Sequence, residues 1–281
     1  MAERPFSVAF TFCLLWLVLV YLCDFVVLPE WTKINTGLCG LDIAFFVMVY
    51  VNEYLGKFQL SYSKFAPEGN INPHFGWSLC YALPAVSQIV FWYFAGMPRS
   101  AFHLVALLTY VGHFVKRVLE ALFIHKYSKK WSALPAIQIS LFYTLGSAVQ
   151  HYWCNLYTDE HLAAKLSSDH LALIVGMVLY FIGELLNGYH HYILASLRPA
   201  GSWAYSIPQA GLFRFVVCPH YTFELVAWFG MAVVCQHLGI YLAWMVMVCY
   251  LAGRSHQTQQ WYQKKIEDFP KDRNNLFPGI Y

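Results

Sequence analysis

The sequence predicts an all-α, polytopic integral membrane protein with about seven or eight transmembrane helices. Of its 281 residues, 59% are hydrophobic and only 12% are charged, roughly half the charge of a typical soluble domain. The apolar residues form runs, most of which approach the ~20 residues that a helix needs to cross a bilayer. No G-x-G-x-x-G motif follows a strand pattern, so no Rossmann domain is expected.

Eight apolar segments justify this fold class, and polar or turn-forming residues separate them. In chain order they are Val8–Leu28, Leu38–Leu55, Phe75–Met97, Ala101–Ile124, Ala133–Tyr157, His170–Leu194, Tyr221–Cys235 and Leu238–Gly253. The last two are short and could form one bent element, so seven spans are the alternative. Glycine and proline predict a long loop at Pro199–Pro219. After Gly253 we expect a short amphipathic helix that ends at Pro270 and lies along the membrane interface.

Basic residues are distributed unevenly between the two ends of the predicted spans. With eight spans, one side receives Arg4, Lys57, Lys64, Lys126, Lys129, Lys130, Arg198, Arg214, Arg254, Lys264, Lys265, Lys271 and Arg273. The other side receives only Lys33, Arg99 and Lys165. Because lysine and arginine collect on the cytoplasmic side of membrane proteins, both termini are expected to face the cytoplasm.

Ionisable residues interrupt the fourth segment. His113 and Arg117 are four residues apart, as are Lys116 and Glu120, so each pair lies on one face of a helix. Charged side chains inside a span are costly and face a protein interior or a water-filled cavity. The group is therefore either a functional site or a structural cluster of ion pairs.

A polar stripe marks the sixth segment and its end. Glu184, Asn187, His191 and Arg198 are separated by three, four and seven residues, which places them on one side of a helix. Such a stripe on an apolar helix requires a partner or a cavity. The alternatives are a binding site and hydrogen bonding between helices.

A third polar group follows the Pro199–Pro219 loop. Pro219 suits the first turn of a helix, so His220, Tyr221 and Glu224 would lie near that helix's N-terminus. A phenol beside a cation could act there as a proton donor. The alternative for Tyr221 is an aromatic residue at the membrane interface.

The C-terminal tail carries the fourth group. Arg254, Thr258 and Tyr262 recur every four residues, so they share one helical face. The alternatives are a binding face and a simple amphipathic anchor.

Neither a metal nor a nucleic-acid partner is predicted. The cysteines lie in or beside apolar segments without C-x-x-C spacing, which argues against zinc and against a disulfide framework. His190 and His191 form the only adjacent histidine pair, whereas di-iron desaturases and hydroxylases of this kind need repeated H-x-x-H-H boxes. Membrane lipids are the expected surroundings, and the oligomeric state stays open.

In order along the chain, these groups resemble the C-terminal domain of the steroid 5α-reductase family. The polar run Tyr205–Phe213, the block Cys218–Tyr221 and the closing segment Gly253–Lys271 carry the resemblance, which covers roughly residues 105 to 281. The family comprises membrane ene-reductases: steroid 5α-reductases, polyprenol reductases and very-long-chain enoyl-CoA reductases. The resemblance implies a reductase domain over residues 101–281, with residues 1–100 shaping the substrate side of a single membrane domain.

The resemblance also implies NADPH as cofactor and assigns site residues. Those expected to hold NADPH are Asn187, His191, Arg198, Tyr205, His220, Glu224, Arg254 and Tyr262. Tyr221 is the expected acid, with Lys116 and Glu120 in support and Tyr81 as the second candidate. Two positions depart from the 5α-reductases, which carry an aspartate where His191 stands and an arginine where Ser206 stands.

The activity implied is that of a 3-oxo-5-alpha-steroid 4-dehydrogenase, which reduces a C=C bond conjugated to a carbonyl in a lipid. Hydride would reach the β-carbon while an acid polarises the carbonyl oxygen, and the α-carbon would take a proton. The alternatives are a very-long-chain trans-2-enoyl-CoA reductase and an inactive lipid-binding or scaffold relative. The Gln-Glu pair with which 5α-reductases grip the 3-oxo group is lacking at Leu79–Pro84, where Tyr81 is the substitute. In a eukaryote, the expected location is the endoplasmic reticulum membrane with the active site toward the cytosol.

The orientation can be tested directly. Glycosylation acceptors inserted near residues 129, 203 and 275 should stay unmodified in microsomes, because the basic residues place all three sites on the cytoplasmic side. An acceptor near residue 165, on the opposite side, should be modified and serves as the control. Modification at any of the first three sites would contradict the eight-span topology.

Overall fold

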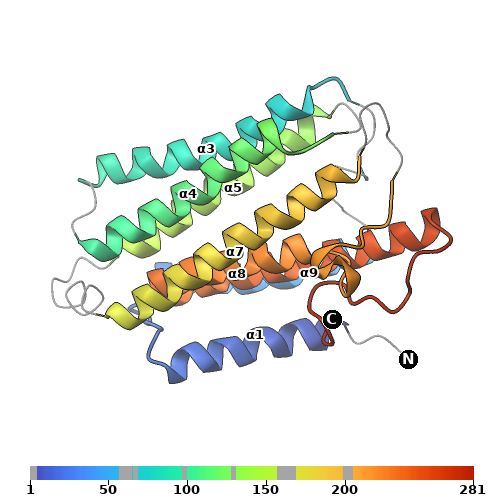
Figure 1. Ribbon diagram of the computed structural model, residues 1–281. Helices are drawn as coiled ribbons and strands as arrows, with labels where there is room; N and C mark the ends of the chain where they lie inside the picture. The colour runs from blue at the N-terminus through green and yellow to red at the C-terminus, as the bar shows by residue number, and fades with distance from the viewer. Residues whose placement is uncertain are drawn as a thin grey trace.

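Eight α-helices form within the described residues, one in each predicted apolar segment, and no β-sheet forms there (Figure 1). The computed structural model describes residues 5–56, 65, 69–96, 100–127, 131–156, 169–198 and 205–281. The helices are α1 (Pro5–Leu22), α2 (Lys33–Leu55), α3 (Pro73–Phe94), α4 (Ala101–Phe123), α5 (Ala133–Asn155), α7 (His170–Ser196), α8 (Pro219–Cys235) and α9 (Leu238–Lys265). The prediction of an all-α fold is confirmed.

Five of these helices are long and apolar enough to cross a membrane: α2, α3, α4, α7 and α9. Large apolar side chains such as Phe75, Phe94, Phe123 and Leu185 point outward, as lipid-facing residues do. The chain is therefore an integral membrane protein.

Local side-chain chemistry sets where several helices begin. The side chains of Thr32, Asn72, Ser100 and Asp169 precede α2, α3, α4 and α7, and each accepts a hydrogen bond from a backbone N–H of the first turn. These contacts satisfy donors that have no partner within the helix. Gly56 ends α2 in the left-handed conformation, with φ of 67°, which glycine adopts without steric cost.

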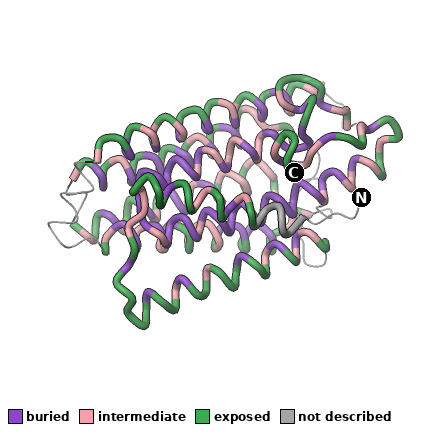
Figure 2. Tube along the Cα trace, turned by 90° about the horizontal axis from the view of Figure 1, so that it is seen from below, coloured by how far each residue is buried: buried purple, intermediate pink, exposed green. Residues whose placement is uncertain are grey.

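α8 and α9 are two separate helices, so the alternative of one bent element is wrong. Gln236 ends α8 with φ of 54°, and the His237 side chain accepts the Gly239 N–H at the start of α9. The predicted separate interfacial helix after Gly253 is also wrong, because α9 continues without a break to Lys265. Its polar end is buried against other parts of the fold, as the purple stretches in Figure 2 show.

The helices are arranged around α8 and α9. In Figure 1, α3, α4 and α5 form one layer, α7 lies beside α8, and α1 flanks the opposite side. None of the outward-pointing large apolar side chains in the described residues belongs to α8 or α9. These two helices therefore form the centre of the bundle, and the others face the lipid.

Glycines let the central helices approach their neighbours closely. A Cβ atom at Gly183 of α7 would lie 2.3 Å from the backbone nitrogen of Ala227 in α8, and one at Gly230 of α8 would lie 2.4 Å from the backbone nitrogen of Tyr180. Gly253 of α9 meets α2 in the same way, 2.8 Å from the Cβ of Glu53. Small residues at such crossings favour helix association in membranes.

Substitution of Gly183 tests this packing. Gly183→Ala should lower the free energy of unfolding in detergent by about 1–3 kcal/mol, because the added methyl group meets helix backbone that must move. Gly37→Ala is the matched control, since a Cβ at this exposed site in α2 meets nothing within 4 Å. The control should be neutral or stabilising by up to about 1 kcal/mol. Equal stability of the two variants would contradict the close α7–α8 contact.

Candidate active site

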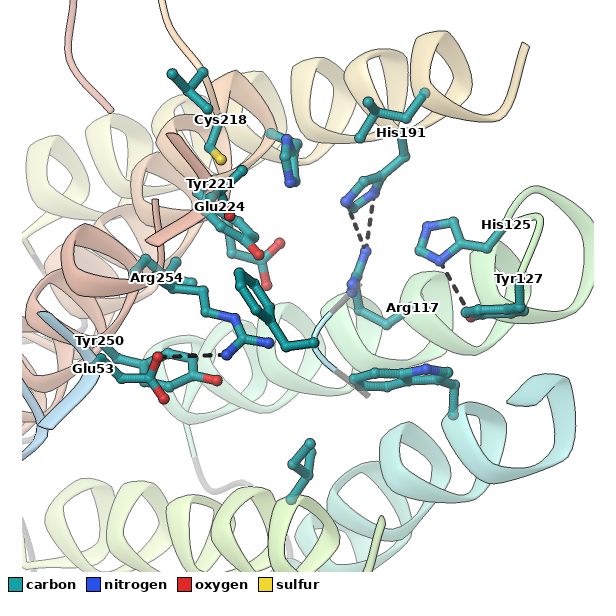
Figure 3. A pocket seen from close by; sticks show the side chains of 18 of the residues that line it. Glu53, Arg117, His125, Tyr127, His191, Cys218, Tyr221, Glu224, Tyr250 and Arg254 are labelled. Carbon is teal, nitrogen blue, oxygen red and sulfur yellow. Dashed lines mark hydrogen bonds and ion pairs between the residues drawn. The ribbon is translucent and has the colours of Figure 1, made fainter. Parts of the chain in front are cut away.

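A cavity of about 670 Å³ opens at one end of the bundle. Its walls come from the C-terminal parts of α2, α4, α7 and α9, the N-terminal parts of α3, α5 and α8, and residues 205–218. Of the site residues predicted from the sequence, those that line it are Tyr81, His191, Arg198, Tyr205, His220, Tyr221, Glu224, Arg254 and Tyr262. Residues from all four polar groups of the sequence thus lie at one end of the bundle, and Figure 3 shows His191, Tyr221, Glu224 and Arg254 around one space.

Arg117 is the centre of one cavity wall. Its Nη1 lies 2.5 Å from Glu120 Oε2 and 3.0 Å from His191 Nδ1, the contact drawn in Figure 3. Its Nη2 donates to the Tyr81 hydroxyl at 2.9 Å, and the guanidinium lies 4.9 Å from the centre of the Tyr81 ring. A buried guanidinium is tolerated because charged and polar partners surround it. Arg117 thereby joins α3, α4 and α7.

Lys116, the preceding residue, lies behind the wall and points toward α7. Its Nζ is 3.1 Å from Glu120 Oε1, 2.9 Å from Glu184 Oε2 and 2.5 Å from Asn187 Oδ1. Asn187 in turn donates to the His220 carbonyl at 2.9 Å and to Glu224 Oε2 at 2.8 Å. Lys116 and Asn187 therefore fix the first turn of α8, which carries Tyr221.

His113 completes a buried group of charges between α4, α7 and α8. Its Nδ1 lies 2.6 Å from Glu184 Oε1, and its Nε2 lies 3.4 Å from Glu224 Oε1. The carboxylates of Glu120 and Glu184 form ion pairs with Lys116 and Arg117, whereas Glu224 lies against His113. Both ring nitrogens of His113 face carboxylates, and a doubly protonated ring can donate to both.

An acid from α2 reaches the opposite wall. Asn52 and Glu53 both line the cavity, and Glu53 Oε2 lies 3.5 Å from Arg254 Nη1 (Figure 3). The Arg254 guanidinium also lies 4.3 Å from the centre of the Phe65 ring. The cavity thus has an amide and an acid on α2, whereas the segment Leu79–Pro84 contains neither. The signal in the sequence is an acid within an apolar span, which marks a functional position by default.

The mouth of the cavity is basic and aromatic. The Arg198 guanidinium lies 4.9 Å from the centre of the Tyr205 ring, and its Nη1 donates to the Lys126 carbonyl at 2.5 Å. Lys126 Nζ returns a hydrogen bond to the Arg198 carbonyl at 2.7 Å. The ring of Tyr205 packs edge-on against Trp261 at 4.6 Å. These contacts join the end of α4, the end of α7 and the tail, while Lys129 and Lys130 lie outside the described residues.

His125, just beyond α4, lines the cavity as a neutral side chain. Burial lowers the pKa of His125 to about 2, and the charge of Arg117 acts in the same direction. Donor atoms of Glu120, His125 and His191 lie within 4.8 Å of one another. The guanidinium of Arg117 already contacts Glu120 and His191, so a cation at this point would meet a fixed positive charge. The absence of a metal stays a prediction.

Comparison of the sequence with known proteins finds similarity to two kinds of enzyme. A family model described as 3-oxo-5-alpha-steroid 4-dehydrogenase matches residues 129–281. The chain is 29% identical over 248 residues to a very-long-chain enoyl-CoA reductase of Dictyostelium discoideum, covering 82% of this chain and 77% of that protein. It is 29% identical over 204 residues to 3-oxo-5-alpha-steroid 4-dehydrogenase 1 of Mus musculus, covering 67% and 80%. The Rattus norvegicus protein of that name is 28% identical over 260 residues, covering 86% and 96%.

Proposed function

The chain belongs to the 3-oxo-5-alpha-steroid 4-dehydrogenase family of oxidoreductases, and we propose that it uses NADPH to reduce a C=C bond conjugated to a carbonyl in a lipid. The observation that carries this proposal is the cavity itself. Cationic and phenolic side chains line it together with apolar side chains such as Met48, Ile139 and Phe142. A volume of this order suits a small-molecule ligand, and the mixed lining suits a polar cofactor beside an apolar substrate.

The residues present fit NADPH. Arg198 and Arg254 offer positive charge to phosphate groups, and Arg254 does so from a site that is only 1% exposed. Tyr205 and Tyr262 offer ring faces at the cavity, and His191, His220 and Glu224 offer hydrogen-bonding groups. Asn187, which does not line the cavity, donates hydrogen bonds to the His220 carbonyl and to the Glu224 side chain. When bound, NADPH supplies the hydride.

Tyr221 is the acid that we assign to the substrate carbonyl. It lines the cavity in the first turn of α8, which Lys116 and Asn187 hold in place. A hydrogen-bond donor fixed in this way stabilises the negative charge that develops on the carbonyl oxygen. Lys116 and Glu120 then act as positioning residues that support Tyr221 through α7 and α8.

Tyr81 remains the second candidate for the acid. Its hydroxyl accepts a hydrogen bond from Arg117, which leaves its own proton available for donation toward the cavity. Glu53 and Asn52 on the opposite wall could contact the same carbonyl. These residues come from α2 and α3, which supports the proposal that residues 1–100 shape the substrate side.

A steroid with a 3-oxo-Δ4 group is the substrate that we propose first, and a trans-2-enoyl-CoA is the alternative. The family match favours the steroid, whereas the similarity to an enoyl-CoA reductase over 82% of the chain favours the thioester. NADPH oxidation by the purified protein, offered both substrates side by side, decides between them. If neither substrate supports NADPH oxidation, the proposal is overturned.

The orientation proposed from the basic residues agrees with this chemistry. The cavity lies at the end of the bundle that carries Lys126, Arg198 and Lys264, and cytosolic NADPH would meet a surface that attracts its phosphates. We propose the endoplasmic reticulum membrane as the location in a eukaryotic cell.

Removal of the deep arginine tests the cofactor site. Arg254→Ala should weaken NADPH binding by about 1.5–3 kcal/mol, the range for a hydrogen bond to a charged group. Lys33→Ala is the control, because Lys33 is exposed at the start of α2 and does not line the cavity. Calorimetric titration measures the affinity, and a melting curve verifies that each variant is folded. Unchanged affinity in folded Arg254→Ala protein would place the cofactor elsewhere.

Removal of the phenol tests the acid. Tyr221→Phe should lower kcat on the true substrate by about 10²-fold or more, while NADPH affinity changes little, because the hydroxyl is assigned to the transition state. Tyr81→Phe is the paired variant. Full activity in Tyr221→Phe together with loss in Tyr81→Phe would move the acid to α3.

A further inference from the structure

Residues 205–218, here called the cavity loop, supply much of the wall next to α7 and α8. Tyr205, Ser206, Phe213, Val217 and Cys218 all line the cavity. The loop contains a short 3-10 helix, Gly211–Arg214, and otherwise lacks regular structure. Contacts with its surroundings must therefore fix its position.

Two sets of contacts with the C-terminal tail hold the ends of the loop. Arg273 donates to the Pro208 carbonyl at 2.9 Å and to Gln209 Oε1 at 3.1 Å. At the other end, the backbone N–H groups of Val217 and Cys218 donate to the carbonyls of residues 274 and 275. The middle of the loop, residues 210–214, lies between these anchors and needs a support of its own.

His190 of α7 supplies that support. Its Nε2 accepts the backbone N–H of Leu212 at 3.2 Å, and its Nδ1 lies 2.7 Å from the Leu186 carbonyl. A carbonyl only accepts and an amide N–H only donates, so Nδ1 carries the proton and Nε2 is bare. Both partners thus require one tautomer of the neutral ring, and His190 acts toward the loop as a hydrogen-bond acceptor.

Packing fixes the ring in this position. His190 is only 2% exposed; it stacks on Phe223 of α8 with 5.2 Å between ring centres and meets Phe213 of the loop edge-on at 5.6 Å. At Gly211, φ is 58° and a Cβ would lie 2.8 Å from His190 Nε2. The loop backbone can approach the ring this closely only because residue 211 is glycine.

We propose that His190 is a positioning residue that docks the middle of the cavity loop onto α7 and so sets the affinity for NADPH. It does not line the cavity, which means that it acts through Phe213 and the residues that follow. The proposal rests on the proposed function in one respect, that the loop covers bound NADPH. Without the docked loop, NADPH binding would have to order residues 210–214, and that ordering weakens affinity.

Hydrogen–deuterium exchange measures the docking without any ligand. In His190→Leu, which keeps an apolar side chain but has no acceptor, protection of the Leu212 amide should fall about three- to tenfold, the range for one net hydrogen bond. In His190→Gln, whose side-chain oxygen can accept the same N–H, protection should return toward the wild-type value. His103→Leu is the matched control: His103 is also buried, near the start of α4 and away from the cavity, so its variant should keep the loop protected.

Kinetics then connect docking with the cofactor. His190→Leu should raise KM and Kd for NADPH about three- to tenfold and leave kcat nearly unchanged, the reverse of the pattern expected for Tyr221→Phe. Wild-type protection at Leu212 in His190→Leu, or protection lost equally in His190→Gln and His190→Leu, would overturn the proposal. If exchange at Leu212 changes in His190→Leu but the wild-type protein binds no NADPH, the docking contact is supported and the proposed function is refuted.

Discussion

The buried charges between α4, α7 and α8 are the constraint on which the rest of the structure depends. Isolated charges in a span are costly, and this fold removes the cost by pairing each one across a helix boundary. Lys116 and Arg117 reach Glu184 and His191 of α7, and Glu224 of α8 lies against His113. The pairing requires all three helices at fixed rotations about their axes. Loss of one partner would leave another charge uncompensated, at a cost of about 3–5 kcal/mol.

Close helix contacts are the second requirement, because the ionic distances can be met only if the backbones approach. Gly183 lies one residue before Glu184, and a Cβ there would collide with the backbone of Ala227. Gly253 likewise lies one residue before Arg254 and meets α2 beside Glu53. In both places the glycine permits a close helix crossing, and the next residue is a charged one that forms an ion pair with a neighbouring helix. Packing and polar chemistry are therefore set by neighbouring positions in the sequence.

The sequence predicts the helices well because each depends on a local property, the length of an apolar run. It also predicts which residues share a helix face, since spacing determines that alone, and it brings His113, Lys116, Arg117 and Glu120 together correctly. It does not predict contacts between distant segments: the approach of Glu53 to Arg254 joins residues that are 201 positions apart. The tail differs from the predicted interfacial helix for the same reason. The polar residues after Gly253 suit an interfacial helix, but in the fold Gln259 donates to the Arg273 carbonyl and Trp261 packs against Tyr205 of the loop.

The adjacent residues Lys116 and Arg117 connect the two candidate acids. Successive residues on an α-helix point about 100° apart, because 3.6 residues complete one turn. Lys116 accordingly faces α7 and, through Asn187, holds the turn of α8 that carries Tyr221. Arg117 faces α3 and holds the Tyr81 hydroxyl. One turn of α4 thus fixes the phenols of two cavity walls relative to each other. Donors fixed in advance need no reorganisation when charge develops on a substrate, so the rigidity that stabilises this end of the bundle is also what a reductase site requires.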